Sequence, residues 1–404
     1  MPIPPVRSTL RIVPFKHEGR DVFLVDDRQE DLFEHQIILP PLGFVVASFL
    51  DGEREAEDVL REILAKFPAS GLSLEHVEAA IKDLDDHLLL ESERVGKKRR
   101  DLEETYLALP SRPSRFVAGT AGEVGKELDG YYAAEAGAGK RGAARPEPLS
   151  GILAPHIDFR RGGHCYTFPY KEVAERSDAE LYVVLGVAHL SPPNPFVVTA
   201  KDYDTPFGPA KADREALASL EKRLGDGIYE NEAVHRAEHS AEFQAVFLKH
   251  ARPKADFTVL SILCSTFEPW CDGRSPRTVG RIADVLGALE EVLEGRKACV
   301  VAGVDFAHVG PVFGDEVEVD QKLVRWMVDE DSKSLQACGA VDAEAFWASV
   351  TADGNKRHVC GLSATYAALS LLPGTSGKLL KYGFAPDPAG GLVSFAGMSF
   401  GPRA

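Results

Sequence analysis

The sequence predicts a layered α/β domain over residues 112–404, preceded by a small domain over residues 1–95 and a linker over residues 96–111. The first reason is length, because 404 residues are more than one ordinary domain needs. The second is that near-continuous apolar segments alternate with helical segments in the larger region. This alternation is typical of parallel strands that are buried on both faces and joined by helices.

In the small domain, short apolar segments come first and helical segments follow. The segments VFLV (22–25) and QIILPP (36–41) predict short strands or turns. Residues 43–67 predict two helices that are separated at Asp51-Gly52.

Residues 73–92 predict a third helix, with Ser73 as its N-cap. Apolar residues at helical spacing indicate that one face of this helix is buried: Val77, Ile81, Leu84, Leu88 and Leu89. The order of these elements, with the segments FLDGER, DVLREI and HLLLES, resembles the winged-helix peptide-binding domains of the PqqD type over about residues 20–95. Those domains hold a leader peptide as an added edge strand. The alternative is a helical accessory domain that has no peptide ligand.

Composition excludes several classes of partner. The net charge of −16 and the pI of about 5.3 disfavour non-specific nucleic-acid binding and docking on an anionic membrane surface. The basic run KKRR (97–100) stands beside the acidic DLEE, which is typical of a solvated surface. No apolar run is long enough to span a membrane and the N-terminus is not a secretory signal, so we expect a cytoplasmic protein whose six cysteines are thiols.

In the larger domain, four apolar segments predict buried parallel strands: GILAPHI (151–157), ELYVVLGVAH (180–189), FTVLSILC (257–264) and KACVVAGVDFAH (297–308). Helices are predicted between them, over residues 214–225, 241–251 and 278–294. Two further strands are predicted at the C-terminal end, over residues 378–385 and 391–401.

Three of these predicted strands end in polar residues. His156 and Asp158 follow the first strand, His189 follows the second, and Asp305 and His308 follow the last. Because ligands bind outside the carboxyl ends of the strands in open α/β sheets, these side chains are expected to converge at one edge.

Two more clusters stand at predicted helix starts. The segment HRAEHSAEF carries Glu238, His239 and Glu242, and the segment KRHVCGLSAT carries His358 and Cys360. A helix N-terminus favours the thiolate form of a cysteine. Imidazole and thiolate together suit zinc, copper or iron, and they exclude a calcium site built only from oxygen ligands.

Six segments, in this order over about residues 112–402, resemble motifs of the Memo family, also called AmmeMemoRadiSam system protein B: APHIDFRRGG, LGVAHLS, DTPFGPAKAD, EHSAEFQ, GVDFAHVG and HVCGLSAT. The resemblance implies the fold of the class III extradiol dioxygenases (LigB-like) and a metal bound by two histidines and one cysteine. Carried over by motif, those ligands are His156, His189 and Cys360. The resemblance also places Asp305, His308 and His239 in the same pocket.

The sequence departs from the family pattern around these positions. Asp158-Phe159 replaces a glycine-tyrosine pair, Leu190 replaces a second histidine, and SRFVAGTAG (114–122) replaces a segment that usually carries a histidine and aromatic residues. The three ligand positions are intact, but the wall of the pocket differs, so a relative's substrate need not transfer.

Several roles stay open from the residues alone. Asp158 is a candidate to orient His156. Cys360 is a metal ligand, a buried thiol, or a nucleophile paired with His358 or His239.

The roles of the other polar residues are equally open. Asp305 and His308 are either acid/base partners or a hydrogen-bonded pair that closes a loop. His239 with Glu242 forms either a base with its orienting carboxylate or a helix N-terminal anion site beside a structural glutamate.

Two functional hypotheses follow. The first is a redox enzyme of the dioxygenase-like kind with an iron or copper centre, zinc being the third option, that acts on a small aromatic molecule or a modified peptide. His239, Asp305 and His308 would then be its acid/base residues. The second is a peptide-binding and metal-binding scaffold that serves a partner radical-SAM enzyme, as the system name implies.

Overall fold

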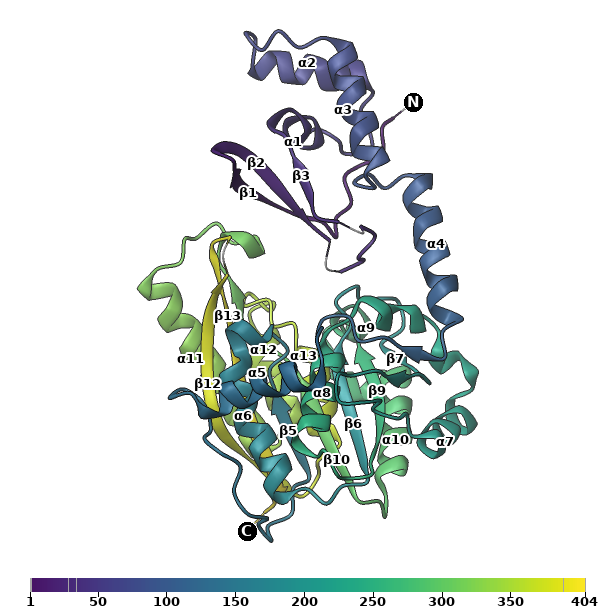
Figure 1. The fold of residues 1–404 in the computed structure, drawn as a ribbon, viewed down its shortest axis with the longest axis vertical. Helices are drawn as coiled ribbons and strands as arrows, with labels where there is room; N and C mark the ends of the chain where they lie inside the picture. The colour runs from purple at the N-terminus through teal and green to yellow at the C-terminus, as the bar shows by residue number, and fades with distance from the viewer. Residues whose placement is uncertain (1, 28, 34, 388, 404) are drawn as a thin grey trace. The chain divides into compact units, whose positions relative to one another are not determined.

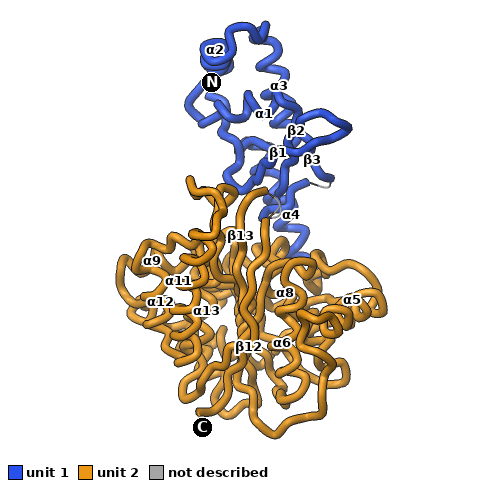
Figure 2. Tube along the Cα trace, turned by 90° about the vertical axis from the view of Figure 1, so that its left-hand side faces the viewer, with its two compact units in different colours: residues 1–109 blue, residues 110–404 orange. Residues whose placement is uncertain are grey.

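The computed structural model describes residues 2–27, 29–33, 35–387 and 389–403. The chain forms two compact units, residues 1–109 (unit 1) and residues 110–404 (unit 2), which Figure 2 colours separately. No helix of the described residues is long and apolar enough to cross a membrane.

Unit 1 contains a three-stranded antiparallel sheet in the order β1-β2-β3, followed by helices. Its elements are β1 (Arg11–His17), β2 (Arg20–Asp26), β3 (Ile37–Leu39), α1 (Pro41–Ala47), α2 (Ala56–Lys66), α3 (Leu74–Asp86) and α4 (Glu93–Leu107). The predicted strands correspond to β2 and β3, and the predicted helices to α1, α2 and α3. Ser73 caps α3 by accepting a hydrogen bond from the backbone N–H of His76. The likeness of this unit to the PqqD type stays a prediction.

Helix α4 occupies most of the segment that was predicted as a linker. Arg99 on this helix pairs with Glu30 and Glu91, and Val95 and Tyr106 are buried. These contacts join α4 to the rest of unit 1, so the compact unit extends to Leu109 rather than ending at residue 95.

Unit 2 is built on an eight-stranded sheet in the order β11-β13-β5-β10-β6-β9-β7, with β12 paired to β13. The four apolar segments form its centre as β5 (Gly151–Ala154), β10 (Ala298–Gly303), β6 (Leu181–Val187) and β9 (Thr258–Cys264), and these four strands are parallel, as predicted. The other strands of this sheet are β7 (Phe196–Val198), β11 (His308–Val309), β12 (Thr375–Asp387) and β13 (Gly391–Pro402). Strands β4 (Ser111–Arg112) and β8 (Asp202–Tyr203) pair with each other in a separate two-stranded sheet.

Helices cover both faces of this sheet. The helices of unit 2 are α5 (Ala121–Ala133), α6 (Phe159–Arg176), α7 (Arg214–Leu224), α8 (Ser240–Ala251), α9 (Glu268–Cys271), α10 (Gly280–Leu293), α11 (Gln321–Ala340), α12 (Ala343–Thr351) and α13 (Leu362–Ser370). Figure 2 shows α5, α6 and α8 on one side of the sheet and α11, α12 and α13 on the other. Strand β6 serves both layers, because Val183 and Leu185 pack into one core while Tyr182 and Val184 pack into the other. Unit 2 is thus the layered α/β domain that the sequence predicts.

The topology brings several chain segments to one edge of unit 2. Strands β5, β10 and β6 are neighbours and parallel, so their carboxyl ends lie side by side. Helix α8 packs on β6 and β10, and α13 packs on the same two strands with residues of the opposite core (Figure 1). The carboxyl ends of these strands and the starts of both helices carry the predicted site residues.

Candidate metal centre

The structure brings together the three predicted metal ligands from three separate elements. His156 follows β5, His189 follows β6, and Cys360 comes just before α13. One donor atom of each residue lies within 4.8 Å of the donor atoms of the other two. Cys360 Sγ lies 3.4 Å from His156 Nε2.

The orientation of His156 is set by the backbone behind it. Its Nδ1 lies 3.0 Å from the carbonyl oxygen of Gly303, which can only accept a hydrogen bond, so Nδ1 carries the proton. In the neutral ring the lone pair is then on Nε2, the nitrogen that faces Cys360. Asp305 Oδ1 accepts a hydrogen bond from the backbone N–H of His156 at 3.0 Å. Asp158, the predicted orienting residue, instead caps α6 and pairs with Arg161, so that prediction was wrong.

Glu238 orients the second histidine. Its Oε2 lies 2.9 Å from His189 Nδ1 and 3.1 Å from the backbone nitrogen of His189, while its Oε1 accepts the N–H of Ser240 at 2.8 Å. A buried carboxylate on one imidazole nitrogen leaves the other nitrogen free to bind a metal. Glu238 directly precedes His239 in the sequence, where no role is predicted for it. A histidine ligand at a strand end needs a carboxylate or carbonyl partner, and a search for that partner could have identified Glu238.

The electrostatics of the site favour a thiolate at Cys360. Burial raises the pKa of the Cys360 thiol, but His156 and His189 lower it by more, to about 7. The effect that the sequence assigned to the helix start therefore comes from the two histidines.

Glu238 and His189 also stabilise each other's charge. Burial lowers the pKa of His189, but the Glu238 carboxylate and then Cys360 raise it by more, so this pKa stands well above its usual range. Burial raises the pKa of Glu238, yet His189 and His239 hold it well below the usual range of a carboxyl group.

A second group of donors shares one histidine with the first. Donor atoms of His189, Glu238 and His239 also lie within 4.8 Å of one another. In this group, however, the His189 nitrogen that faces Glu238 is Nδ1, which already forms a hydrogen bond with that carboxylate. Glu238 is also held by Ser240. We therefore assign Glu238 to the support of His189 rather than to a ligand set of its own.

His239 lies at the start of α8, against the two histidine ligands. Its ring stacks on His189 with centroids 5.0 Å apart and stands edge-on to His156 at 5.3 Å. Its Nδ1 is 3.5 Å from Glu238 Oε1. The side chain is 29% exposed. Because it is partly exposed and lies against both histidine ligands, His239 can contact a molecule that binds beside them from the solvent side.

Glu242, the other predicted partner of His239, serves a structural purpose. It forms a fully buried ion pair with Arg112, and its Oε1 accepts the backbone N–H groups of Arg115, Phe116 and Val117. Of the two alternatives for Glu242, these contacts support the structural glutamate and not the carboxylate that orients His239.

Asp305 and His308 lie near each other, but each is held by other groups. Burial has the largest effect on the Asp305 carboxyl and raises its pKa to about 6, against the lowering effect of His308. Asp305 Oδ1 accepts a hydrogen bond from the backbone N–H of His156, whereas His308 Nδ1 contacts the carbonyl oxygen of Phe306 at 3.2 Å. Asp305 thus acts on His308 through its charge.

His358 does not face the thiol. It is exposed, and its Nδ1 lies 3.2 Å from the backbone oxygen of His308. The partners of the Cys360 thiol are His156 and His189 instead. A nucleophile that His358 activates is therefore not supported.

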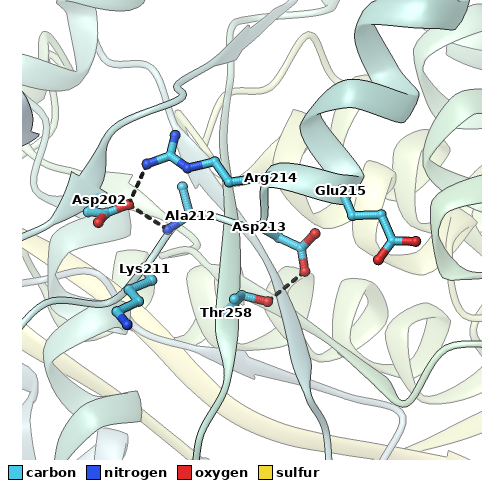
Figure 3. A pocket seen from close by; sticks show the side chains of 7 residues that line it. All are labelled: Asp202, Lys211, Ala212, Asp213, Arg214, Glu215 and Thr258. Carbon is cyan, nitrogen blue, oxygen red and sulfur yellow. Dashed lines mark hydrogen bonds and ion pairs between the residues drawn. The ribbon is translucent and has the colours of Figure 1, made fainter.

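A separate hollow of about 410 Å³ lies at the other end of the sheet. Thr258, on its wall, is the first residue of β9, and Asp213 caps the start of α7. Figure 3 shows Arg214 turned toward Asp202, and Thr258 toward Asp213. Of its charged residues, Asp202 pairs with Arg214 and Asp213 pairs with Arg296, and the hollow is remote from the carboxyl ends of the strands.

Comparison with known proteins gives one family. Residues 121–399 match the model of the Memo-like proteins. A MEMO1 family protein of Aquifex aeolicus is 27% identical over 369 residues, which cover 90% of this chain and 92% of the relative. A MEMO1 family protein of Thermus thermophilus is 28% identical over 373 residues, with 90% and 94% covered.

A third relative covers a shorter part of the chain. A MEMO1 family protein of Methanopyrus kandleri is 27% identical over 307 residues, which are 72% of this chain and 98% of the relative. By contrast, alignments that cover 90% of this chain cannot lie within residues 110–404 alone. The Aquifex and Thermus relatives therefore also match part of unit 1.

Proposed function

The chain belongs to the Memo-like protein family, and from this premise we propose that it is a metal-binding protein with redox activity, whose metal is held by His156, His189 and Cys360. The observation that carries the proposal is the donor set. Two imidazoles, each with its other nitrogen already hydrogen-bonded, face one thiol of lowered pKa. Such a set fits a transition metal, because soft thiolate and imidazole donors are the ligands that iron, copper and zinc accept.

When bound, the metal would supply a Lewis-acidic centre, redox-active in the case of iron or copper, with coordination positions left for a substrate. We propose iron first, with copper and zinc as alternatives, because of the likeness to the extradiol dioxygenases. Those enzymes use two histidines and a carboxylate, whereas this chain offers Cys360 as its third donor. Ring cleavage of the ordinary kind is therefore disfavoured, and the proposal is limited to a dioxygenase-like oxidation by O₂ in which both oxygen atoms enter the substrate.

We propose that two histidines move protons at this centre. His239 is partly exposed and stacks on His189, so it can take a proton from a substrate in front of the metal. Burial lowers the pKa of His308, which keeps its imidazole neutral and able to accept a proton. The nearby charge of Asp305 would stabilise the imidazolium that results.

Metal analysis of the full chain, purified without oxygen, tests the ligand set. We expect about one metal ion per chain in the wild type and a loss of tenfold or more in affinity for His156→Ala and for Cys360→Ala, since each removes a ligand. Cys271→Ala is the matched control, because this buried thiol lies on α9 outside the donor set. Unchanged metal content in both ligand variants would refute the assignment.

Oxygen consumption tests the redox part of the proposal. Metal-loaded protein is supplied with catechols and with a modified peptide, and O₂ uptake is recorded for the wild type and for His239→Gln. We expect uptake with one of these classes and a 100-fold or larger loss in the variant, as removal of a general base predicts. If the metal-loaded protein consumes no O₂ with catechols or with the modified peptide, the proposed oxidation is refuted and only metal binding remains.

A second candidate function rests on unit 1. An apolar hollow of about 460 Å³ lies between α1 and α2, lined by residues that include Leu42, Val45 and Ile63. Among the described residues, strand β3 borders only β2 in the sheet, and its Ile38 is 40% exposed. A sheet edge beside an apolar hollow suits an extended peptide with one large apolar side chain. We propose this unit as the part that would present a peptide to a partner enzyme of the radical-SAM class.

Fluorescence anisotropy with labelled extended peptides tests this second candidate on the full chain. Val45→Asp places a charge in the hollow and is expected to weaken binding tenfold or more. Glu57→Gln, on the exposed side of α2, is the control. Equal affinities in the wild type and in Val45→Asp would remove unit 1 from consideration as the peptide site.

A further inference from the structure

A buried arginine–carboxylate pair holds the loop that leads to Cys360. Arg357 Nη1 pairs with Asp331 of α11, and the two side chains are 2% and 0% exposed. The second terminal nitrogen of Arg357 lies 3.1 Å from Ser334 Oγ. Buried charges are costly even when they are paired, so a pair three residues before Cys360 calls for an explanation.

The loop that leads to Cys360 has a backbone that needs support. Asn355 and His358 have φ values of +54° and +47°, in the left-handed region that side chains other than glycine rarely adopt. Asn355 stabilises the turn locally, because its Oδ1 accepts the N–H of Val359 at 2.8 Å. Residues in this region persist where the surrounding structure holds them. Arg357 lies between the two strained positions, so its buried guanidinium anchors the loop.

The other carboxylate oxygen of Asp331 contacts strands β12 and β13. Asp331 Oδ2 accepts hydrogen bonds from Ser394 Oγ on β13 at 2.5 Å and from the Tyr382 hydroxyl on β12 at 2.8 Å. Ser394 Oγ accepts the N–H of Ala307 at 2.8 Å, and the Ser394 carbonyl accepts the N–H of Phe306 at 2.8 Å. The segment that follows Asp305 is therefore held by the same carboxylate as the cysteine loop.

The loop before Cys360 and the segment after Asp305 also contact each other directly. The N–H of His308 donates to the carbonyl oxygen of Arg357 at 2.6 Å. The N–H of Gly361 donates to the carbonyl oxygen of Asp305 at 3.2 Å, and Cys360 Sγ lies 3.8 Å from that oxygen. The positions of Cys360 and His308 are thus coupled through one buried network.

We propose that Asp331, Arg357 and Ser394 are positioning residues of the metal centre. Their network holds the thiol against the two histidine ligands before a metal arrives, and it holds the segment of Asp305 in register with the thiol. None of the three residues belongs to the proposed ligand set; each acts through the two loops. The inference rests on the proposed metal-binding function, and preorganised donors are what such a site requires.

Two readouts on the full chain test the proposal. The first is Co²⁺ affinity, followed by the thiolate-to-cobalt absorption band. The second is the alkylation rate of Cys360 by iodoacetamide at pH 7 in metal-free protein. Of the six cysteines, all within the described residues, Cys360 is the one that is not buried, and Cys360→Ser identifies its reaction.

Ser394→Ala and Asp331→Asn are the test variants. We expect each to weaken Co²⁺ binding about 10- to 100-fold, the loss typical of groups that orient metal ligands. We also expect the alkylation rate to change about threefold or more, because release of the cysteine loop changes how far the Cys360 thiol is exposed to the reagent. Ser394→Ala keeps both charges of the buried pair. It therefore still tests the positioning role of the network if Asp331→Asn does not fold.

Asp27→Asn is the matched control, since Asp27 forms a buried ion pair with Arg7 in unit 1 with side chains 3% and 0% exposed. It should leave both readouts unchanged. A test variant that melts at a lower temperature, yet binds Co²⁺ and reacts with iodoacetamide as the wild type does, would overturn the proposal in favour of a purely structural pair. Failure of the wild type to bind Co²⁺ would instead refute the proposed function, and the alkylation rates would still test the positioning.

Discussion

Units 1 and 2 both bury arginine–carboxylate pairs, but the pairs support different parts of the chain. In unit 1, Arg7 pairs with Asp27 and also contacts the carbonyl oxygen of Leu88, which fastens the N-terminal segment to the end of α3. In unit 2, the pairs Arg112–Glu242 and Arg357–Asp331 hold segments that border the metal centre. Burying a charge is tolerated where it sets a geometry that apolar contacts cannot set. The buried pairs of unit 2 therefore hold segments beside the candidate site, whereas the pair of unit 1 holds the start of the chain.

The largest expected effect comes from breaking a buried pair of unit 2. Glu242→Gln leaves Arg112 buried without its counter-charge, which should cost unit 2 about 3–5 kcal/mol. Urea denaturation followed by tryptophan fluorescence measures this unit selectively, because its three tryptophans are those of the whole chain: Trp270, Trp326 and Trp347.

The control for that loss is an exposed pair of the same unit. Arg277 and Glu290 pair with side chains 42% and 39% exposed, so Glu290→Gln should cost less than about 1 kcal/mol. Equal losses for Glu242→Gln and Glu290→Gln would mean that burial of the pair contributes nothing.

A buried histidine of unit 2 should make this unit sensitive to acid. Burial lowers the pKa of His235 to about 3, and Arg112 adds to this effect. The neutral ring lies 3.0 Å from the carbonyl oxygen of Val197 and 2.6 Å from the Tyr203 hydroxyl. Because the unfolded chain takes up this proton near pH 6.5 and the folded chain does not, stability present above pH 6.5 is lost as pH falls toward 3.

By pH 4.5 this loss should reach about 2.5 kcal/mol for unit 2 relative to pH 7. His235→Gln can keep both hydrogen bonds and removes the proton uptake, so its urea midpoint should fall less between pH 7 and pH 4.5. An equal fall of the urea midpoint in the wild type and in His235→Gln would show that proton uptake by His235 does not cause the loss of stability.

Glu238 should tune the metal centre without being a ligand. Glu238→Gln removes the charge that holds His189 Nδ1, and we expect metal affinity to fall about 10- to 100-fold while one ion per chain still binds. Glu230→Gln is the control, because that side chain is 66% exposed. Complete loss of metal in Glu238→Gln, at saturating concentration, would make Glu238 a ligand instead.

The smallest effect is expected at the helix caps of unit 1. Ser73 caps α3 through its hydroxyl, so Ser73→Ala should cost about 1 kcal/mol. Ser92 occupies the same position before α4, but within the described residues its hydroxyl makes no capping bond, so Ser92→Ala should be close to neutral. Amide hydrogen exchange in α3 and α4 distinguishes the two variants, and a larger loss for Ser92→Ala would contradict the assignment of caps.

Much of unit 2 could be predicted because its strands are apolar on both faces. Strands β5, β6, β9 and β10 lie within the predicted segments, and helices α7, α8 and α10 between them were also predicted. Helix α6 was not, because Gly162, Gly163 and Pro169 disfavour a helix locally. Packing against β5 and β13 stabilises this helix regardless, and such packing cannot be read from the segment alone.

The candidate ligands His156, His189 and Cys360 were named from strand ends and from the family resemblance, and they lie together in the structure. The orienting carboxylates were assigned less well. Asp158 was preferred for His156 because it is near in sequence, whereas Asp305, on a different strand end, lies against that histidine.

The amino-acid sequence by itself determined the alternation of buried strands and helices in unit 2, because the periodicity of apolar residues is a local property. It also determined that histidine side chains follow two of the parallel strands. Only the tertiary structure decided which carboxylate serves which histidine, that Cys360 owes its lowered pKa to His156 and His189, and that Asp331 holds two loops at once. These are contacts between residues far apart in the chain, so they depend on how the layers pack rather than on any segment.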